Sequence, residues 1–223
     1  MDAFRLKKAE ALRASKRTPY APSFDRTHTL IDARELQDGK TCTVAGRVML
    51  WRDMGKVTFA TLQDHTGRMQ IALKEDVMGA SAYADMLSML DLGDIIGVSG
   101  ERITTKTGEP TVQAKSWTML TKALRQPPEK WHGIADQETA WRQRYLDLTS
   151  NEETRKRFLF RSTFIKLLRE FYWSHNFVEV ETPVLVNAAS GALAEPFLTR
   201  HNAYDMDVYL RIATETFLKE CLV

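Results

Sequence analysis

Apolar and polar residues alternate from Thr41 to about Lys122, which is the pattern of short strands that bury one face each. The first strand is expected to place four residues on one face: Val44, Gly46, Val48 and Leu50. Turn residues separate it from further strands, predicted at residues 56–64, 68–73, 94–104 and 111–122. Residues 83–90 predict a short helix. The pattern therefore predicts five strands with one helix before the fourth.

This order of elements is that of an OB-fold barrel, whose second and third strands often form a face that binds oligonucleotides. Fold order indicates function only weakly, because OB-folds also bind other ligands. The alternation predicts that Phe59 and Gln70 point outward on neighbouring strands while aliphatic residues fill the barrel. An exposed aromatic ring can stack an unpaired base, and an amide can read a base edge.

Arg52 and Glu109 are expected at turns near the same face. A guanidinium there can hold a phosphate, and a carboxylate can accept a hydrogen bond from a base imide N–H. The pattern leaves an alternative open, in which Phe59 is a core residue and Glu109 is a solvated turn residue.

A long helix is predicted from Asn151 to His175, a stretch without Gly or Pro. Its apolar residues recur at helical spacing: Phe160, Phe164, Leu167, Leu168, Phe171 and Tyr172. Ser150 and Glu153 have the spacing of a capping box and predict its start. Asn176 tolerates the left-handed conformation that ends a helix.

Shorter elements are expected after this helix. Residues 177–180 predict a strand that Pro183 ends, because proline lacks the N–H that pairing requires. Residues 208–212 predict another strand. Thr214 is expected to cap a helix that begins at Glu215.

Breaks in the pattern divide the chain into four segments. Residues 1–26 predict a helix and linker with seven basic and three acidic residues. Such a run is usually a solvated face, and contact with a phosphate backbone is the alternative. Residues 27–122 form the predicted barrel, residues 123–140 a hinge rich in breakers, and residues 141–223 an α+β domain.

Composition narrows the class of protein. The 223 residues carry a formal net charge of +2 and are 43% hydrophobic, which allows one or two cored domains and neither demands nor excludes nucleic acid. Cys42 and Cys221 form no CxxC, so we predict no disulfide framework and no metal site, as in a reducing cytosol. No apolar run approaches the roughly 20 residues that span a bilayer. We therefore expect a cytoplasmic protein without a membrane partner.

The residue identities around the long helix carry a family resemblance. The helix followed by Phe177–Pro183 resembles motif 1 of the class II aminoacyl-tRNA synthetases. Trp141–Leu148 resembles a segment of their lysine, aspartate and asparagine branch. Three further stretches resemble the lysine enzymes: residues 190–197, 201–203 and 209–213. The whole chain thus resembles the N-terminal part of a class II lysyl-tRNA synthetase, an OB-fold barrel followed by the start of an antiparallel-sheet catalytic domain.

The resemblance implies a ligase that activates lysine with ATP and Mg²⁺ and transfers it to the 3′ end of lysine tRNA. It implies that the barrel reads the central uridine of the anticodon with four residues: Arg52, Phe59, Gln70 and Glu109. It implies that Gly191 lines the lysine pocket and that Glu215 faces the lysine ammonium. Motif 1 implies a homodimer whose interface includes Phe164, Leu168, Glu181 and Pro183.

Three residues depart from the family pattern. Ser190 replaces a glycine and Glu195 a basic residue, which changes the contacts that this loop can make. Thr214 replaces a proline, a mild change because threonine caps helices well.

Motifs 2 and 3, whose arginines clamp ATP, are not found in the sequence. We therefore assign no catalytic residue to this chain and expect it to be inactive alone. One other hypothesis is a non-catalytic fragment or paralogue that binds the tRNA anticodon. Another is the aspartyl- or asparaginyl-tRNA synthetase branch, against which Glu215 and residues 190–197 argue.

Overall fold

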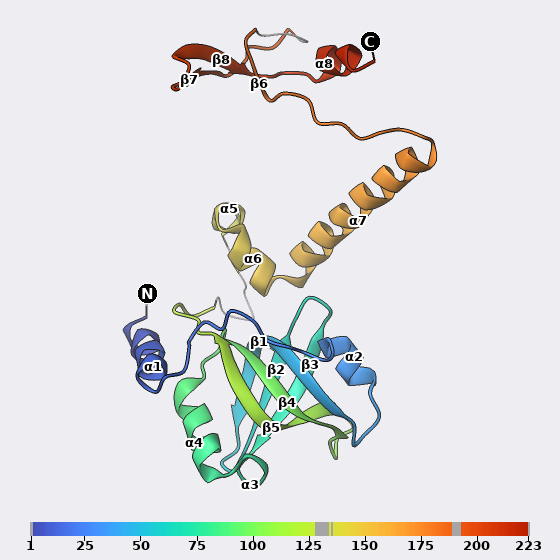
Figure 1. Cartoon of the computed structure of the whole chain (residues 1–223). Helices are drawn as coiled ribbons and strands as arrows, with labels where there is room; N and C mark the ends of the chain where they lie inside the picture. The colour runs from blue at the N-terminus through green and yellow to red at the C-terminus, as the bar shows by residue number, and fades with distance from the viewer. Residues whose placement is uncertain (1, 128–133, 135, 189–192, 223) are drawn as a thin grey trace. The chain divides into compact units, whose positions relative to one another are not determined.

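The computed structural model describes residues 2–127, 134, 136–188 and 193–222. The chain divides into two compact units, Met1–Thr154 and Arg155–Val223, and each is described by itself (Figure 1). Part of the predicted hinge lies outside the described residues, as do Ser190 and Gly191. The boundaries at residues 26, 122 and 140 remain predictions.

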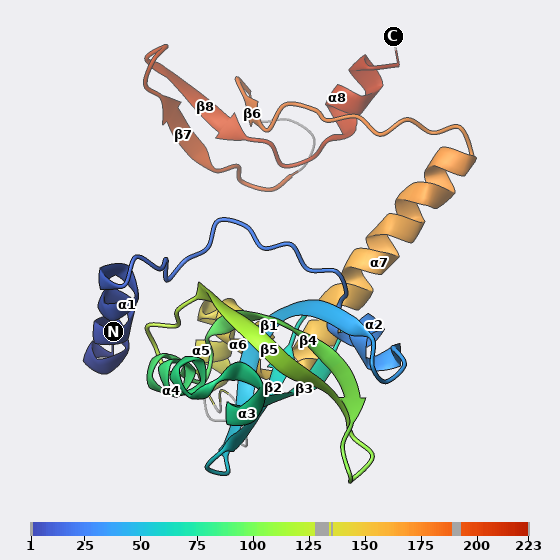
Figure 2. The same ribbon diagram turned by 60° about the horizontal axis from the view of Figure 1, so that its bottom comes forward.

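Five strands of the first unit form a closed barrel in the order β1-β2-β3-β5-β4 (Figure 2). They are β1 (Thr41–Asp53), β2 (Val57–Gln63), β3 (Arg68–Lys74), β4 (Ile95–Thr104) and β5 (Pro110–Thr121). The pair of β3 and β5 is parallel, and the other neighbouring pairs are antiparallel. Helices α3 (Glu75–Met78) and α4 (Ala80–Met89) connect β3 to β4. The predicted order, five strands with a helix before the fourth strand, is confirmed.

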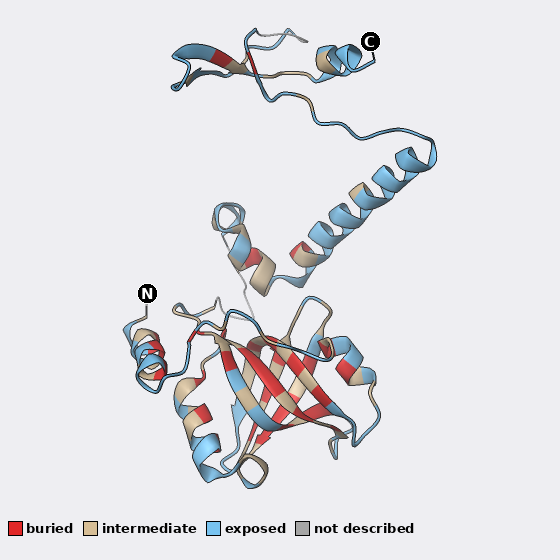
Figure 3. Ribbon diagram, viewed as in Figure 1, coloured by how far each residue is buried: buried red, intermediate tan, exposed pale blue. Residues whose placement is uncertain are grey.

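The core of this unit is the barrel interior (Figure 3). Every second residue of β2 is buried, including Ala60 and Leu62, because successive side chains of a strand point to opposite faces. Phe59 on β2 and Gln70 on β3 belong to the other set and are half-buried. The prediction that these two residues face outward is confirmed.

Strand β1 contains a bulge. Val48 pairs with Leu62, but the register then shifts so that Leu50, rather than Met49, pairs with Thr61. A bulge sets two residues against one and thereby reverses the alternation of the residues beyond it. The prediction that Leu50 shares the inward face of Val48 is therefore wrong, and Leu50 lies on the outer face beside Thr61.

Helix α1 (Ala3–Ala14) confirms the predicted N-terminal helix and is fastened to the barrel through its basic residues. Arg5 Nη1 donates to the carbonyl oxygens of Leu92, at 2.8 Å, and Ala123, at 3.3 Å. Lys8 Nζ donates to Asp91 Oδ1 at 2.9 Å. At least two of the basic residues in this segment therefore hold the fold together.

Lys122, which follows β5, is buried with its ammonium group among oxygen atoms. Its Nζ lies 2.5 Å from Asp91 Oδ2, 2.6 Å from Asp94 Oδ2 and 2.8 Å from the Met89 carbonyl oxygen. Burial raises the pKa of Asp94, although hydrogen bonds oppose the shift. Burial acts in the same direction on Asp91, but the bonds from Lys122 and Lys8 outweigh it and lower the pKa of Asp91.

Replacing Lys122 by methionine is expected to lower the free energy of unfolding by about 3–5 kcal/mol, because Asp94 would remain buried without its cationic partner. Urea titration followed by circular dichroism measures this change. The matched control is Lys115→Met, which removes an exposed ion pair with Glu101 and should cost less than about 1 kcal/mol. Equal effects of the two substitutions would contradict a structural role for the buried cluster.

Three helices follow the barrel: α5 (Gln137–Arg142), α6 (Arg144–Ser150) and α7 (Glu152–Ser174). The predicted long helix is confirmed, but its predicted cap is wrong. Asn151 Oδ1 accepts the N–H groups of Glu153, at 3.0 Å, and Thr154, at 3.2 Å. The Ser150 hydroxyl instead donates to the Leu146 carbonyl oxygen at 2.9 Å, because Ser150 is still part of α6.

Asn176 ends the helix with φ of 66°, as predicted. The strand predicted at 177–180 is wrong, because this segment pairs with no described strand, and Val178 is 82% exposed. A strand requires a neighbour that takes up its N–H and C=O groups.

The second unit contains a sheet of order β6-β8-β7, formed by Leu185–Val186, Met206–Leu210 and Leu198–His201 respectively. The strand predicted at 208–212 is confirmed as β8, two residues earlier. Helix α8 (Glu215–Glu220) begins where predicted. Thr214 precedes it in a helical conformation and makes no side-chain cap bond, so the predicted cap is wrong.

Candidate nucleic-acid interface

The outer face of β1 and β2 brings a cation and an aromatic ring together. Arg52 of β1 stands directly opposite Phe59 of β2. Residues opposite each other in an antiparallel pair share a face, so both side chains project outward. This placement depends on the bulge, because an unbroken alternation from Val48 would turn Arg52 inward. Arg52 is exposed and Phe59 is half-buried, so the guanidinium is accessible beside the ring.

Gln70 of β3 extends this face by one strand. It stands opposite Thr61, the second residue after Phe59, and is therefore a diagonal neighbour of the ring, typically roughly 7–8 Å away. On its other side Gln70 pairs with Thr111 of β5, and Gln70 Nε2 donates to Thr111 Oγ1 at 2.9 Å. This bond fixes the amide plane and leaves the second Nε2 hydrogen and the amide oxygen available to a ligand.

Glu109 precedes β5 and joins the same network through its backbone. Thr111 Oγ1 donates to the Glu109 carbonyl oxygen at 3.1 Å. Glu109 itself lies in the turn before β5, so it adjoins the outer face through its bond to Thr111. Its carboxylate is half-exposed and accepts a hydrogen bond from Arg34 Nη1 at 3.1 Å. Arg52, Phe59 and Gln70 thus share the outer face of three neighbouring strands, and Glu109 is joined to them through Thr111. The prediction that Arg52 lies at a turn is wrong, because β1 continues to Asp53.

Arg34 comes from α2 (Leu30–Glu35), a helix that the sequence analysis missed. Its signal is the Thr29-x-x-Asp32 capping box, in which each side chain bonds the other residue's backbone N–H. The Leu30 N–H donates to Asp64 Oδ2 at 3.0 Å, which attaches the helix start to the β2–β3 turn. Helix α2 therefore has a fixed position beside the barrel.

This face matches the chemistry of a single-stranded base. A ring offers a stacking surface, the guanidinium and amide donate to carbonyl oxygens or phosphate, and the ionised carboxylate accepts from an N–H. A pyrimidine with two carbonyl groups and an imide N–H would satisfy all of these groups at once. The half-exposed state of Phe59, Gln70 and Glu109 leaves them partly accessible to such a ligand.

Of the two residues predicted for a second site, the structure describes Glu215 alone. Glu215 Oε1 accepts from Lys219 Nζ at 2.6 Å, an exposed pair on one turn of α8. Gly191 lies outside the described residues. Glu195 is described and exposed.

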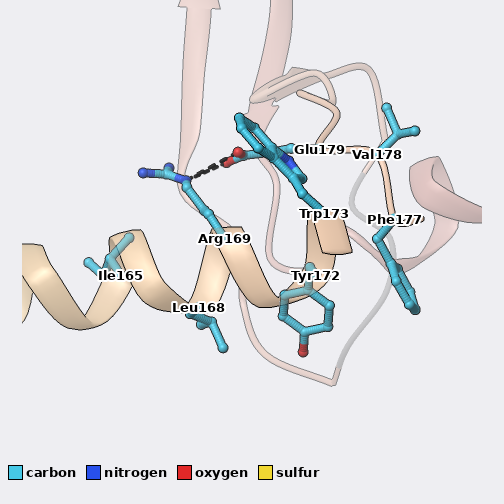
Figure 4. Close-up of a pocket in the computed structure, with 8 residues that line it drawn as sticks. All are labelled: Ile165, Leu168, Arg169, Tyr172, Trp173, Phe177, Val178 and Glu179. Atoms are coloured by element: carbon cyan, nitrogen blue, oxygen red, sulfur yellow. Dashed lines mark hydrogen bonds and ion pairs between the residues drawn. The ribbon is translucent and has the colours of Figure 1, made fainter. Parts of the chain in front are cut away.

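The four residues predicted for the dimer interface are all exposed: Phe164, Leu168, Glu181 and Pro183. A groove of about 380 Å³ lies between the last turns of α7 and the segment after it (Figure 4). It is lined by residues that include Leu168, Tyr172 and Phe177. Arg169 Nε, which also lines it, donates a hydrogen bond to Glu179 Oε1 at 3.0 Å. The groove is mostly apolar with one ion pair.

In the part of the chain that the structure describes, His, Cys, Asp and Glu form no group of three or more that could hold a metal ion. Within the same residues, no helix has the length and apolar character needed to cross a membrane.

Two family models match the chain. The model for tRNA synthetases class II (D, K and N) matches residues 136–223, and that for the OB-fold nucleic acid binding domain matches residues 42–120. The chain belongs to the class II tRNA synthetases.

Lysine–tRNA ligases are among the relatives of this synthetase chain. That of Enterococcus faecalis is 47% identical over 229 residues, covering 98% of this chain and 46% of the relative. That of Carboxydothermus hydrogenoformans is 47% identical over 222 residues, with 98% and 45% covered. That of Pasteurella multocida is 48% identical over 229 residues, with 98% and 46% covered. The chain therefore spans somewhat less than half the length of these relatives.

Asp64 accepts a hydrogen bond from the first residue of α2, and its ionisation makes the stability of the fold depend on pH in acid. Burial would raise the pKa of Asp64, but hydrogen bonds from Thr66, Leu30 and Gly67 outweigh it and lower the pKa. A lowered folded-state pKa contributes stability that is present above the unfolded value of about 3.9 and is lost as pH falls through the folded value.

The substitution Asp64→Asn is therefore expected to cost about 1–3 kcal/mol of unfolding free energy at pH 7 and clearly less at pH 3. Urea titrations of the synthetase chain at both pH values measure the two differences. The control Asp25→Asn changes an exposed aspartate before α2 and should shift neither value by more than about 0.5 kcal/mol. A cost for Asp64→Asn that does not shrink in acid would contradict this account.

Proposed function

We propose that the protein is a lysine–tRNA ligase, which joins lysine to the 3′ end of lysine tRNA at the expense of ATP. The observation that carries the proposal is the outer face of the barrel, where Arg52, Phe59, Gln70 and Glu109 lie together in a chain 47% identical to the lysine–tRNA ligase of Enterococcus faecalis. Their proposed ligand is the central uridine of the anticodon.

The proposed contacts follow from the chemistry of uracil. The base stacks on Phe59, and its imide N–H donates to the Glu109 carboxylate. Gln70 faces the polar edge of the base, and Arg52, directly beside Phe59, contacts phosphate or a base oxygen. Stacking tolerates any base, so Glu109 and Gln70 carry the selectivity.

The proposal assigns lysine recognition to Glu215 and Gly191. A carboxylate suits the lysine ammonium because charge-assisted hydrogen bonds discriminate against neutral or shorter side chains. Lys219, which now pairs with Glu215, would have to give way to the substrate. The proposal names no Mg²⁺ ligand and no catalytic group among the described residues. Cys42 and Cys221 are both free thiols, which suits the cytoplasm as the proposed compartment.

Binding of a fluorescently labelled anticodon stem-loop of lysine tRNA tests the anticodon assignment. Phe59→Ala is expected to weaken binding roughly ten- to hundredfold, since stacking on an aromatic side chain contributes about 1–3 kcal/mol per base. Changing the central uridine to cytidine should weaken binding of the unaltered protein to a similar degree.

The matched control is Phe4→Ala, which removes an exposed aromatic side chain from α1 and should leave the affinity unchanged. Equal binding of the two stem-loops, with a steep dependence on salt, would indicate only generic contacts with phosphate and would overturn the proposal.

We also propose a homodimer formed through α7. The support is the apolar row that includes Phe164 and Leu168, which are 57% and 43% exposed, together with the unpaired segment after the helix. Apolar surface on one helix face is typical of a helix that packs against a partner.

Sedimentation equilibrium tests this interface. Leu168→Asp is expected to weaken the dimer at least about tenfold, because it buries a charge without a partner. Ser162→Asp adds the same charge two residues before Phe164, on the opposite side of the helix, and should leave the dissociation constant unchanged. Similar effects of both variants would contradict the assignment of this face.

A further inference from the structure

An ion pair joins α2 to the interface at Glu109. Arg34 Nη1 lies 3.1 Å from Glu109 Oε1, and the two side chains are 40% and 43% exposed. An exposed pair of this kind adds little to stability, since water screens it and two long side chains are immobilised. Its consequence is geometric, because the guanidinium restricts where the carboxylate can point.

Hydrogen bonds hold both ends of α2, the helix that carries Arg34. At the start, the capping box and the Asp64 carboxylate bind backbone N–H groups of α2. At the end, Arg102 Nη2 donates to the Arg34 carbonyl oxygen at 3.3 Å. Arg102 is itself buried and is fixed by Asp38 and Thr104. The guanidinium of Arg34 is thus carried by a helix attached to two different parts of the barrel.

Glu109 is constrained from the other side through its backbone. The Thr105 hydroxyl accepts the Glu109 N–H at 3.0 Å, and Thr111 bonds the Glu109 carbonyl oxygen. With its backbone fixed and Oε1 occupied by Arg34, Oε2 is left for a ligand. Thr111 Oγ1 also accepts from Gln70 Nε2, so one hydroxyl holds both the Gln70 amide and the Glu109 backbone.

The fixed oxygen distinguishes two pyrimidines. An ionised carboxylate only accepts hydrogen bonds. Uracil presents a donor at N3, whereas cytosine presents an acceptor there, so the same oxygen attracts one base and repels the other. A carboxylate that is free to rotate can turn away from cytosine and lose this repulsion. The strength of discrimination therefore depends on what holds the carboxylate in place.

We propose that Arg34 is a positioning residue for uridine selection, acting through Glu109 without contacting the base. This inference rests on the proposed function, because it requires the barrel face to bind the central uridine. Arg34 would determine the ratio of the dissociation constants for cytidine and uridine, with a smaller effect on affinity for the uridine stem-loop.

Fluorescence anisotropy with two lysine-tRNA anticodon stem-loops, carrying uridine or cytidine at the central position, tests the proposal. Arg34→Met is expected to lower the ratio of dissociation constants at least about fivefold. Arg34→Lys should retain part of it, because an ammonium keeps the charge but lacks the planar fork. Melting temperatures should stay within about 3 °C of the unaltered protein, since the pair is exposed.

A double-mutant cycle separates positioning from general effects. If Arg34 acts through Glu109, then Arg34→Met should have no further effect on the ratio in a Glu109→Gln background. Lys106→Met removes an exposed positive charge from the same turn as Glu109 and should alter binding of both stem-loops alike, leaving the ratio unchanged.

The outcomes distinguish failure of the proposed function from failure of the role proposed for Arg34. If the unaltered protein binds both stem-loops equally, the proposed function fails and this inference fails with it. If the unaltered protein discriminates but Arg34→Met keeps the full ratio, or if the two substitutions act additively, the proposed function stands and the role of Arg34 is overturned.

Discussion

The bulge in β1 is the constraint on which the interface depends. Before it, β1 contributes Val48 to the barrel core, and after it the strand contributes Arg52 to the outer face. One extra residue thus lets a single strand fill the core at one end and present a charged side chain on the outer face at the other. Without this reversal, a charged side chain would point into an apolar interior and Phe59 would have no cation opposite it.

The parallel contact of β3 with β5 adds the second half of the interface. It closes the barrel and places Thr111 beside Gln70, so the hydroxyl accepts from the amide and donates to the Glu109 carbonyl oxygen. The same contact that removes two exposed strand edges therefore also fixes the polar groups of the site. Fold and site are built by one set of strand pairings, which explains why the outer face can be rigid without being buried.

The alternation of apolar residues was sufficient to predict the barrel order and the outward direction of Phe59 and Gln70. It was insufficient at Leu50, since Met49, Leu50 and Trp51 are all apolar and hide the change of phase that the bulge causes. It also missed α2, because six residues are too few for helical periodicity and only the Thr29 and Asp32 box signals them. The strand expected at 177–180 shows the opposite limit: apolar residues indicate strand propensity, but pairing depends on a neighbour that the local sequence does not contain.

Two ion pairs of the barrel unit show how burial decides what an interaction does. Lys122 and Asp94 have no exposed side-chain surface, so removal of Lys122 leaves Asp94 as a buried charge without its cationic partner, and the pair governs folding. Arg34 and Glu109 are about two-fifths exposed, so water replaces either partner at small cost. The exposed pair can therefore change without unfolding the barrel, and its carboxylate remains accessible to a ligand. In this barrel the buried ion pair therefore keeps the fold in place, while the partly solvated pair leaves polar groups of the outer face within reach of solvent.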